Sequence, residues 1–241
     1  MKTILVVGIG TGSPDHMTIA AIDALNRADV LFVPDKGANK ADLAGIRRTI
    51  IARFVKGAPL QLSYDVPRRD AANPDYGQGV DDWHDALGQI FSDLIAQIPE
   101  NGTGAFLVWG DPGLYDSTLR ILERVDTPMQ VEVIPGITAI QALTAAHGVA
   151  LNRIGEPVLI TTGRQLGPVD TDAVVMLDGR LAFRDADPDL TIFWGAYLGT
   201  ADQLLIAGRL GDVTEQIVTT RAEARARHGW IMDIYLLRKA Q

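Results

Sequence analysis

Short apolar runs alternate with stretches of helical periodicity through the first half of the chain. Runs rich in apolar residues at 3–7, 30–33, 105–109 and 131–134 each predict a strand, and weak alternation of apolar and polar residues over 60–66 predicts another. Between these runs, apolar residues recur at helical spacing, most clearly over 80–98. Alternation of strands and helices favours βαβ units, and continuously apolar strands favour a parallel sheet that is buried on both faces.

Individual side chains can be placed on the predicted helices. Thr18 precedes apolar residues at helical spacing, and we expect it to cap a helix that begins there. The helix through 43–51 is expected to carry Arg47 and Arg48 on its surface side. In the apolar stripe over 80–98, Trp83 is expected in the core, with His84 beside it and either partly exposed or directed into a cleft.

The pattern changes around 151–157. Runs at 158–162, 190–194, 216–220 and 231–237 predict strands, 170–177 and 201–210 predict helices, and 179–189 predicts a loop. We therefore expect an α/β protein of two domains, the first (1–136) with a parallel sheet and flanking helices and the second (137–241) with a mixed sheet. A cleft between the two domains is the expected active site.

The composition narrows the function. The chain has 241 residues, 47% of them hydrophobic, and a formal net charge of −8, which disfavours nucleic acid as a partner. It has no cysteine, so disulfides and thiolate metal sites are excluded, and its four histidines show no zinc-binding spacing. No apolar segment resembles a signal peptide or a membrane span, so we expect a cytoplasmic protein without a metal and without a membrane partner.

Glycine-rich loops follow three of the predicted strands, at 8–15, 110–115 and 135–139. Such loops lie at the carboxyl edge of a parallel sheet, where backbone N–H groups can face a ligand, although Gly, Pro and Asp also form ordinary turns. The first loop reads GxGxG, and Ser13 stands where the dinucleotide fingerprint needs its third glycine, so an NAD-dependent oxidoreductase is disfavoured. In the third loop, Thr138 offers a hydroxyl at a helix N-terminus.

Taken together, the three loops resemble the signatures of the tetrapyrrole (corrin/porphyrin) methylase family, which uses S-adenosylmethionine. The resemblance rests on VGIGTGSPDHMT at 7–18, on Gly110-Asp111-Pro112 with Tyr115, and on IPGITA at 134–139. Features around 35–37, 67–76, 83–84 and 226–230 are similar to the branch that methylates precorrin-5 at C-1. That branch releases acetate and yields precorrin-6A and S-adenosylhomocysteine.

The resemblance also implies site residues and a homodimer. Residues expected to bind the cofactor are Gly10, Thr11, Gly110, Asp111, Pro112, Leu114, Thr138, Ala139 and Trp194. Catalytic candidates for the loss of acetate are Asp35, His84 and Tyr115. The carboxylates of the macrocycle call for local cations, and the candidates are Lys36, Arg68, Arg69 and Arg164, whose alternative role is that of solvated loop charges. Competing functions are methylation of a different macrocycle position and non-enzymatic nucleotide binding.

Overall fold

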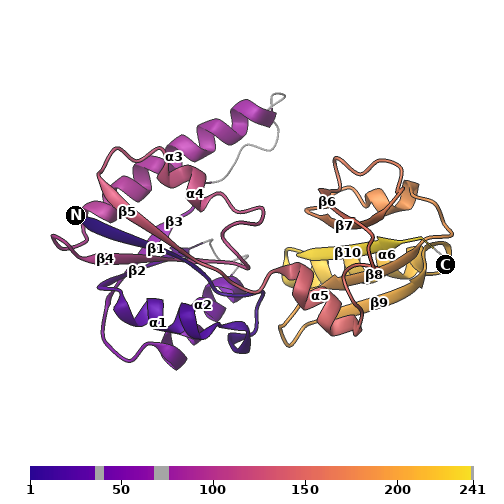
Figure 1. Ribbon diagram of the computed structural model, residues 1–241, viewed down its shortest axis with the longest axis horizontal. Helices are drawn as coiled ribbons and strands as arrows, with labels where there is room; N and C mark the ends of the chain where they lie inside the picture. Colours follow the sequence, from indigo (N-terminus) through magenta and orange to yellow (C-terminus); the bar gives the residue numbers. More distant parts are fainter. Residues whose placement is uncertain (36–40, 68–75, 240–241) are drawn as a thin grey trace. The chain divides into compact units, whose positions relative to one another are not determined.

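The chain forms two compact units. The computed structural model describes residues 1–35, 41–67 and 76–239, with the side chains at 35, 41–44 and 76 outside this description. One unit comprises Met1–Gly10 and Pro14–Ile137, and the other comprises Thr11–Ser13 and Thr138–Gln241 (Figure 1). Within the described residues, no helix is long and apolar enough to cross a membrane.

The first unit is built on a five-stranded parallel sheet, which confirms the predicted architecture. The strand order is β3-β2-β4-β1-β5, and every neighbouring pair is parallel. The strands are β1 (Lys2–Gly8), β2 (Val30–Asp35), β3 (Leu60–Asp65), β4 (Thr103–Val108) and β5 (Met129–Ile134). In the register of the sheet, Val6 of β1 lies between Phe106 of β4 and Val133 of β5.

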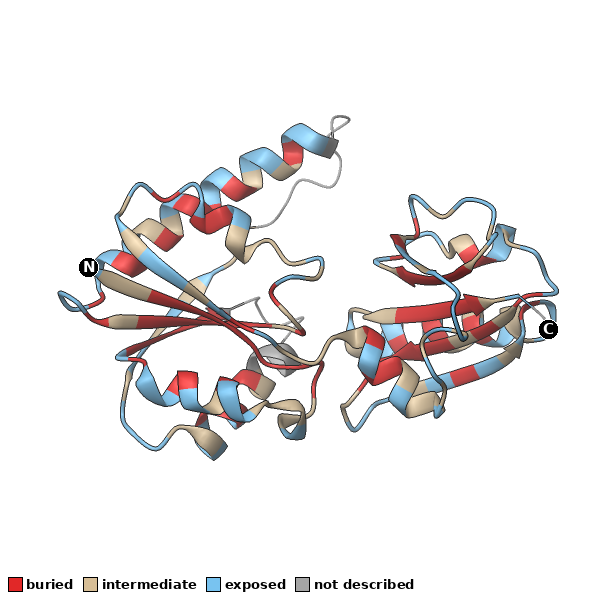
Figure 2. Ribbon diagram, viewed as in Figure 1, coloured by how far each residue is buried: buried red, intermediate tan, exposed pale blue. Residues whose placement is uncertain are grey.

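Helices cover both faces of this sheet (Figure 1). α1 (Ile19–Arg27) and α2 (Ala41–Phe54) cover one face, and α3 (Tyr76–Ala96) and α4 (Thr118–Leu122) cover the other. Because successive strand residues point to opposite faces, Ile4 and Val6 pack toward α3 while Leu5 and Val7 pack toward α1. The central strands are buried, as Figure 2 shows in red, and this accounts for their continuous apolar runs.

Two local predictions for this unit have different outcomes. Thr18 caps α1 as expected, and its hydroxyl accepts a hydrogen bond from the backbone N–H of Ala21 at 3.0 Å. The surface placement of Arg47 is wrong, since its side chain is 4% exposed, whereas Arg48 is exposed as predicted. Helical periodicity identifies the apolar face from apolar residues, so it assigns a buried arginine to the wrong side of the helix.

The second unit contains the predicted mixed sheet, in the order β6-β7-β10-β8-β9. β6 and β7 are parallel, and the other pairs are antiparallel. α6 packs against the sheet face that carries Trp194, and α5 packs near Gly195 on the other face. The elements are α5 (Ala139–His147), β6 (Val158–Thr162), β7 (Asp172–Met176), β8 (Thr191–Ala196), β9 (Leu204–Arg209), α6 (Leu210–His228) and β10 (Asp233–Arg238).

Three predicted elements of this unit have the wrong secondary structure. The run at 216–220 is β-branched, yet it lies within α6, because Leu210, Ile217 and Ala224 form one buried helical stripe there. The segments 170–177 and 201–210 contain strands β7 and β9 instead of helices. Short apolar runs such as 173–175 have no periodicity that separates a buried strand from a buried helix.

Candidate functional site

The three glycine loops meet at the carboxyl edge of the parallel sheet. A Cβ atom on Gly8 would lie 2.6 Å from the backbone nitrogen of Gly136 and 2.8 Å from the carbonyl oxygen of Gly110. A Cβ atom on Gly136 would collide with the same Gly110 oxygen. The loops that follow β1, β4 and β5 therefore touch through their backbones, which only glycine permits at this distance.

Two backbone hydrogen bonds join the first two loops. The N–H of Gly110 donates to the carbonyl of Gly10 at 2.8 Å, and the N–H of Gly10 donates to the carbonyl of Gly110 at 3.3 Å. Both glycines have positive φ angles, +77° at Gly10 and +69° at Gly110. A Cβ atom on Gly110 would meet nothing within 4 Å, so space is open beside this part of the loop.

Asp111 fastens the loop after β4 to the loop after β5. Its Oδ2 accepts a hydrogen bond from the backbone N–H of Gly136 at 2.9 Å, and its Oδ1 accepts one from Gly113 at 2.7 Å. Pro112 beside it is buried, and Leu114 is half-buried. These contacts give the carboxylate of Asp111 a positioning role, since it fixes the shape of the loop itself.

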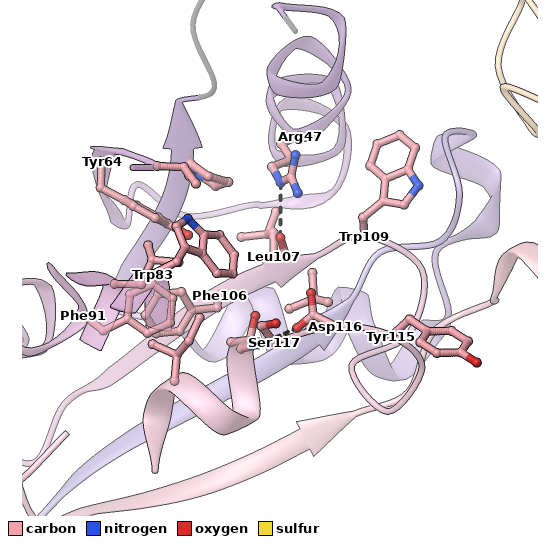
Figure 3. Close-up of a pocket in the computed structure, with 16 residues that line it drawn as sticks. Arg47, Tyr64, Trp83, Phe91, Phe106, Leu107, Trp109, Tyr115, Asp116 and Ser117 are labelled. Carbon is pink, nitrogen blue, oxygen red and sulfur yellow. Dashed lines mark hydrogen bonds between the residues drawn. The ribbon is translucent and has the colours of Figure 1, made fainter. Parts of the chain in front are cut away.

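A cavity of about 210 Å³ lies at the same sheet edge (Figure 3). It opens among the carboxyl ends of β2, β3 and β4, the helices α2 and α3, and the loop that precedes α4. Aromatic rings and polar groups both line its wall. The aromatic residues include Tyr64, Trp83 and Phe106, and the polar ones include Arg47, Asp116 and Ser117.

Arg47 is the buried cation of this wall. Its Nε donates a hydrogen bond to the carbonyl of Leu107 at 3.1 Å, and its guanidinium carbon lies 6.0 Å from the ring centre of Trp109. Burial lowers the pKa of the guanidinium, while Tyr64 and Asp116 oppose that shift. Because Arg47 is buried, solvent screens its charge weakly, and the guanidinium interacts strongly with anionic groups.

Tyr64 and Asp116 supply further polar groups to the cavity. The Tyr64 ring packs edge-on against Phe91, with ring centres 5.8 Å apart, and burial raises the pKa of its phenol, which stays protonated. Asp116 accepts a hydrogen bond from the backbone N–H of Thr118 at 2.7 Å, at the start of α4. The cavity thus offers a hydroxyl and a carboxylate beside apolar rings.

The sequence comparison decides the family. Residues 3–214 match the tetrapyrrole (corrin/porphyrin) methylases. The chain belongs to this family. It is also 53% identical to a precorrin-6A synthase (deacetylating) of a Sinorhizobium species, over 99% of this chain and 96% of that relative.

Solved structures agree with this assignment. A cobalamin synthesis related protein (CobF) from Corynebacterium diphtheriae superimposes with a TM-score of 0.86 and 42% identity, and each chain is covered completely. A cobalt precorrin-4 methyltransferase, CbiF, has a TM-score of 0.64 and 16% identity, with 98% of this chain and 94% of that chain covered. At that identity, the second comparison supports the tetrapyrrole methylase fold alone.

Two cofactor residues expected from the family lie at the start of α5, in the second unit. Thr138 is the N-cap of α5, and its hydroxyl accepts a hydrogen bond from the N–H of Ile140 at 3.1 Å. Thr138 and Gln141 form a capping box, and Ala139 is the first residue of the helix. Thr11, also in the second unit, is buried.

Trp194 is fully buried in the second unit. Its indole Nε1 donates to Asp233 at 3.1 Å, within the cluster that α6 covers. Phe193, the preceding residue, faces the other side of the strand and packs edge-on against His147, with ring centres 5.5 Å apart. The observed contacts of Trp194 are those of a core residue, and its role toward the cofactor remains a prediction.

Of the catalytic candidates, Tyr115 lines the cavity. It is 45% exposed, has a φ of +51°, and lies at the rim in Figure 3 with its ring turned away from Phe91 and Phe106. His84 is buried against Trp83 and is not part of the cavity wall. Among the described residues, its Nε2 has no hydrogen-bond partner, and burial followed by the charge of Arg124 lowers its pKa.

Several candidates lie outside the described residues. These are Lys36, Arg68, Arg69 and the side chain of Asp35. Arg164 is exposed in the second unit, in the loop after β6. Within 1–35, 41–67 and 76–239, no group of three or more histidine or carboxylate side chains is arranged to hold a metal ion.

Sequence reasoning missed three polar residues of the cavity. Helical periodicity places Arg47 on the helix surface, and Tyr64 belongs only to a weakly alternating strand. Asp116 had a usable signal, because it follows the Gly-Asp-Pro loop directly and loops at strand ends carry ligand-binding side chains.

Proposed function

We propose that this tetrapyrrole methylase transfers the methyl group of S-adenosylmethionine to C-1 of precorrin-5. The reaction releases acetate and leaves precorrin-6A and S-adenosylhomocysteine. The observation that carries the proposal is the 53% identity, over 99% of the chain, to a precorrin-6A synthase (deacetylating). Methylation of a different macrocycle position is the alternative, since the chain is also 30% identical to a precorrin-2 C(20)-methyltransferase over 72% of its length.

The glycine loops fit S-adenosylmethionine as the methyl donor. Space for a ligand is open beside Gly110. The backbones of Gly8, Gly110 and Gly136 lie so close together that a Cβ atom on Gly8 or Gly136 would disturb the loops around this space. Gly10, Thr11, Asp111, Leu114, Thr138 and Ala139 are the further residues proposed to surround the cofactor. The cofactor supplies an activated methyl group, and the contribution of the chain is to hold the reacting carbon in line with it.

The substrate requires cations, because precorrin-5 carries many carboxylates while the chain has a net charge of −8. Lys36, Arg68, Arg69 and Arg164 are proposed to bind these carboxylates. We expect Arg69→Ala to raise the KM for precorrin-5, and unchanged KM and turnover would remove Arg69 from this role. We also propose that the protein is a cytoplasmic homodimer and that it acts without a metal and without nucleic acid.

Calorimetry tests the cofactor assignment. We expect the protein to bind S-adenosylmethionine and to show no comparable heat with NAD or ATP. Gly110→Trp, which fills the open space, should abolish that binding. Gly57→Trp is the matched control, because Gly57 lies in an exposed loop before β3, at the opposite edge of the sheet. Equal affinity in Gly110→Trp and wild type would remove the loop from the cofactor site.

Turnover tests the reaction itself. The protein is incubated with precorrin-5 and S-adenosylmethionine, and the products are measured by mass spectrometry together with an acetate assay. Equal amounts of precorrin-6A, acetate and S-adenosylhomocysteine are expected. Methylation without acetate would contradict the deacetylating reaction and favour another position of the macrocycle.

A further inference from the structure

We propose that the cavity beside β4 is the deacetylation subsite, which receives the two-carbon acyl group of the substrate and holds it as acetate when it leaves. This inference rests on the proposed function and deepens it. It assigns the loss of acetate to a specific place in the first unit, beside the point where the glycine loops meet, and to a ligand of one chemical class, a short acyl or carboxylate group.

The size of the cavity excludes the macrocycle and suits an appendage. Pockets for drug-sized ligands commonly measure about 300–1,000 Å³. At about 210 Å³, this cavity is smaller than that range, and a tetrapyrrole exceeds it by far. Only a substituent of the macrocycle can enter, while the ring system stays outside.

The topology of the sheet places the cavity next to the glycine loops. β1 and β2 lead into α1 and α2 on one face, whereas β4, which lies between them, leads into α4 on the other face. Such reversals open crevices at the carboxyl ends of the strands, here one on each side of β4. The glycine loops meet on the β1 side, and the cavity lies on the β2 side.

One loop borders both places. Residues Gly110 and Asp111 contact the other glycine loops, while Trp109, Tyr115 and Asp116 line the cavity. A substrate carbon held over this loop can therefore present its acyl group to the cavity and its other side to the glycine loops. That arrangement suits a carbon that loses an acyl group and gains a methyl group.

The wall of the cavity matches an acyl group that becomes acetate. Phe91 and Phe106 stack with ring centres 4.3 Å apart and offer an apolar surface to a methyl group. The protonated phenol of Tyr64 is a hydrogen-bond donor for a carbonyl or carboxylate oxygen. Arg47 adds a buried positive charge to the same wall, and this charge favours an anionic carboxylate there.

Asp116 is the general base of this subsite. A carboxylate has two oxygens with several acceptor sites, and Oδ1 accepts from Thr118 while the side chain lines the cavity. Water adds to the acyl carbonyl carbon and gives one proton to Asp116. The bond between that carbon and C-1 breaks, and its electron pair stays with the macrocycle. Acetate leaves, its remaining proton passes to solvent, and the electron pair forms the new bond to the methyl group.

Two variants test the subsite. Ser117→Leu fills the cavity, and it removes no capping bond because the Ser117 side chain makes none. Asp116→Asn removes the base and keeps an oxygen for Thr118. We expect kcat for acetate release and for methyl transfer to fall together, by about 10²-fold or more in each variant, with little change in the affinity for S-adenosylmethionine. Matched controls are Ser63→Leu on β3 and Asp126→Asn after α4, both at exposed positions.

Sodium acetate is the direct probe. Added acetate should inhibit the wild-type protein competitively with precorrin-5 and should not inhibit Ser117→Leu. If the variants raise KM and keep kcat, the cavity binds a peripheral carboxylate side chain of the macrocycle, and the deacetylation assignment is overturned. Acetate release at the wild-type rate in both variants would also overturn it, with the proposed function intact. A wild-type protein that methylates precorrin-5 without releasing acetate contradicts both.

Discussion

The carboxylate of Asp111 accepts a hydrogen bond from the backbone N–H of Gly136, 2.9 Å away, and so ties the loop after β4 to the loop after β5. The other oxygen of the same side chain accepts from Gly113 within its own loop. Asp111, which the family resemblance predicts to contact the cofactor, therefore also stabilises the structure of the two loops. Its loss should be visible in stability as well as in binding.

Asp111→Ala should lower both the stability of the protein and its affinity for S-adenosylmethionine. The change leaves the N–H groups of Gly113 and Gly136 without their charged acceptor, which costs about 1–3 kcal/mol. Affinity should fall at least about tenfold as the loops separate. Urea denaturation and calorimetry measure the two effects, with Asp126→Ala at an exposed site as the control. Weaker binding at wild-type stability would show that Asp111 acts only as a ligand contact.

Gly136→Ala and Gly110→Ala should differ sharply, although both lie in the same cluster of loops. At Gly136 a Cβ atom collides with the backbone of Gly110 and Gly8, so the strands must shift, at a cost of about 3 kcal/mol. At Gly110 the space is open and the cost is that of a positive φ, about 1 kcal/mol. The unfolding free energies of the two variants provide the measurement. Equal losses would mean that the close approach of the three loops is wrong.

Tyr115 is held in a left-handed conformation, with a φ of +51°, at the rim of the cavity. Tyr115→Gly should relieve that strain, so the free energy of unfolding should stay the same or rise by up to about 1 kcal/mol. Turnover of precorrin-5 should nevertheless fall by about tenfold or more as the ring is lost. Tyr115→Phe keeps the ring and should retain most activity. A comparable loss in Tyr115→Phe would instead assign the phenol to the chemistry.

The fold of the first unit could be predicted from the sequence because short segments of the chain carry the signals for its strands and helices. The central strands β1, β2 and β4 are buried on both faces and read as apolar runs, and the intervening helices show their own period. The loops follow from the strands, since the carboxyl ends of parallel strands share one edge. This shared edge brings Gly8, Gly110 and Gly136 together.

The second unit and the cavity depend on contacts that the sequence does not display. The run at 216–220 has strand propensity, but the packing of Ile217 and Ala224 against the sheet makes it helical. Arg47 is polar and was placed on the surface, whereas the carbonyl of Leu107, 60 residues away, holds it in the interior. Long-range partners such as these override local pattern, and they determine the polar wall of the cavity.

Asp233→Ala should destabilise the protein far more than Asp189→Ala. Asp233 pairs with Arg221 at 2.8 Å with side chains 6% and 9% exposed, and it also accepts from the Trp194 indole. Removing it leaves a buried guanidinium uncompensated, at a cost of about 3–5 kcal/mol. Asp189 pairs with Arg209 on the surface, where solvent screens the two charges, so its loss should change the unfolding free energy little. Similar denaturation midpoints for the two variants would contradict the buried position of the Arg221–Asp233 pair.

His84 should make the stability of the protein depend on pH below neutrality. Burial, followed by the charge of Arg124, lowers the pKa of His84 in the folded state, while the unfolded chain keeps the ordinary value of 6.5. Below that value the unfolded state binds a proton that the folded state does not, so this contribution to stability is present above pH 6.5 and is lost as the pH falls. His84→Gln removes it. Between pH 7.5 and about pH 5.5, the variant should lose less unfolding free energy than wild type, as measured by urea denaturation.

Burial also lowers the pKa of His16, but that residue is present in both proteins and its effect cancels in the comparison. A loss in the variant as large as in wild type would show that the pKa of His84 is not lowered by the fold.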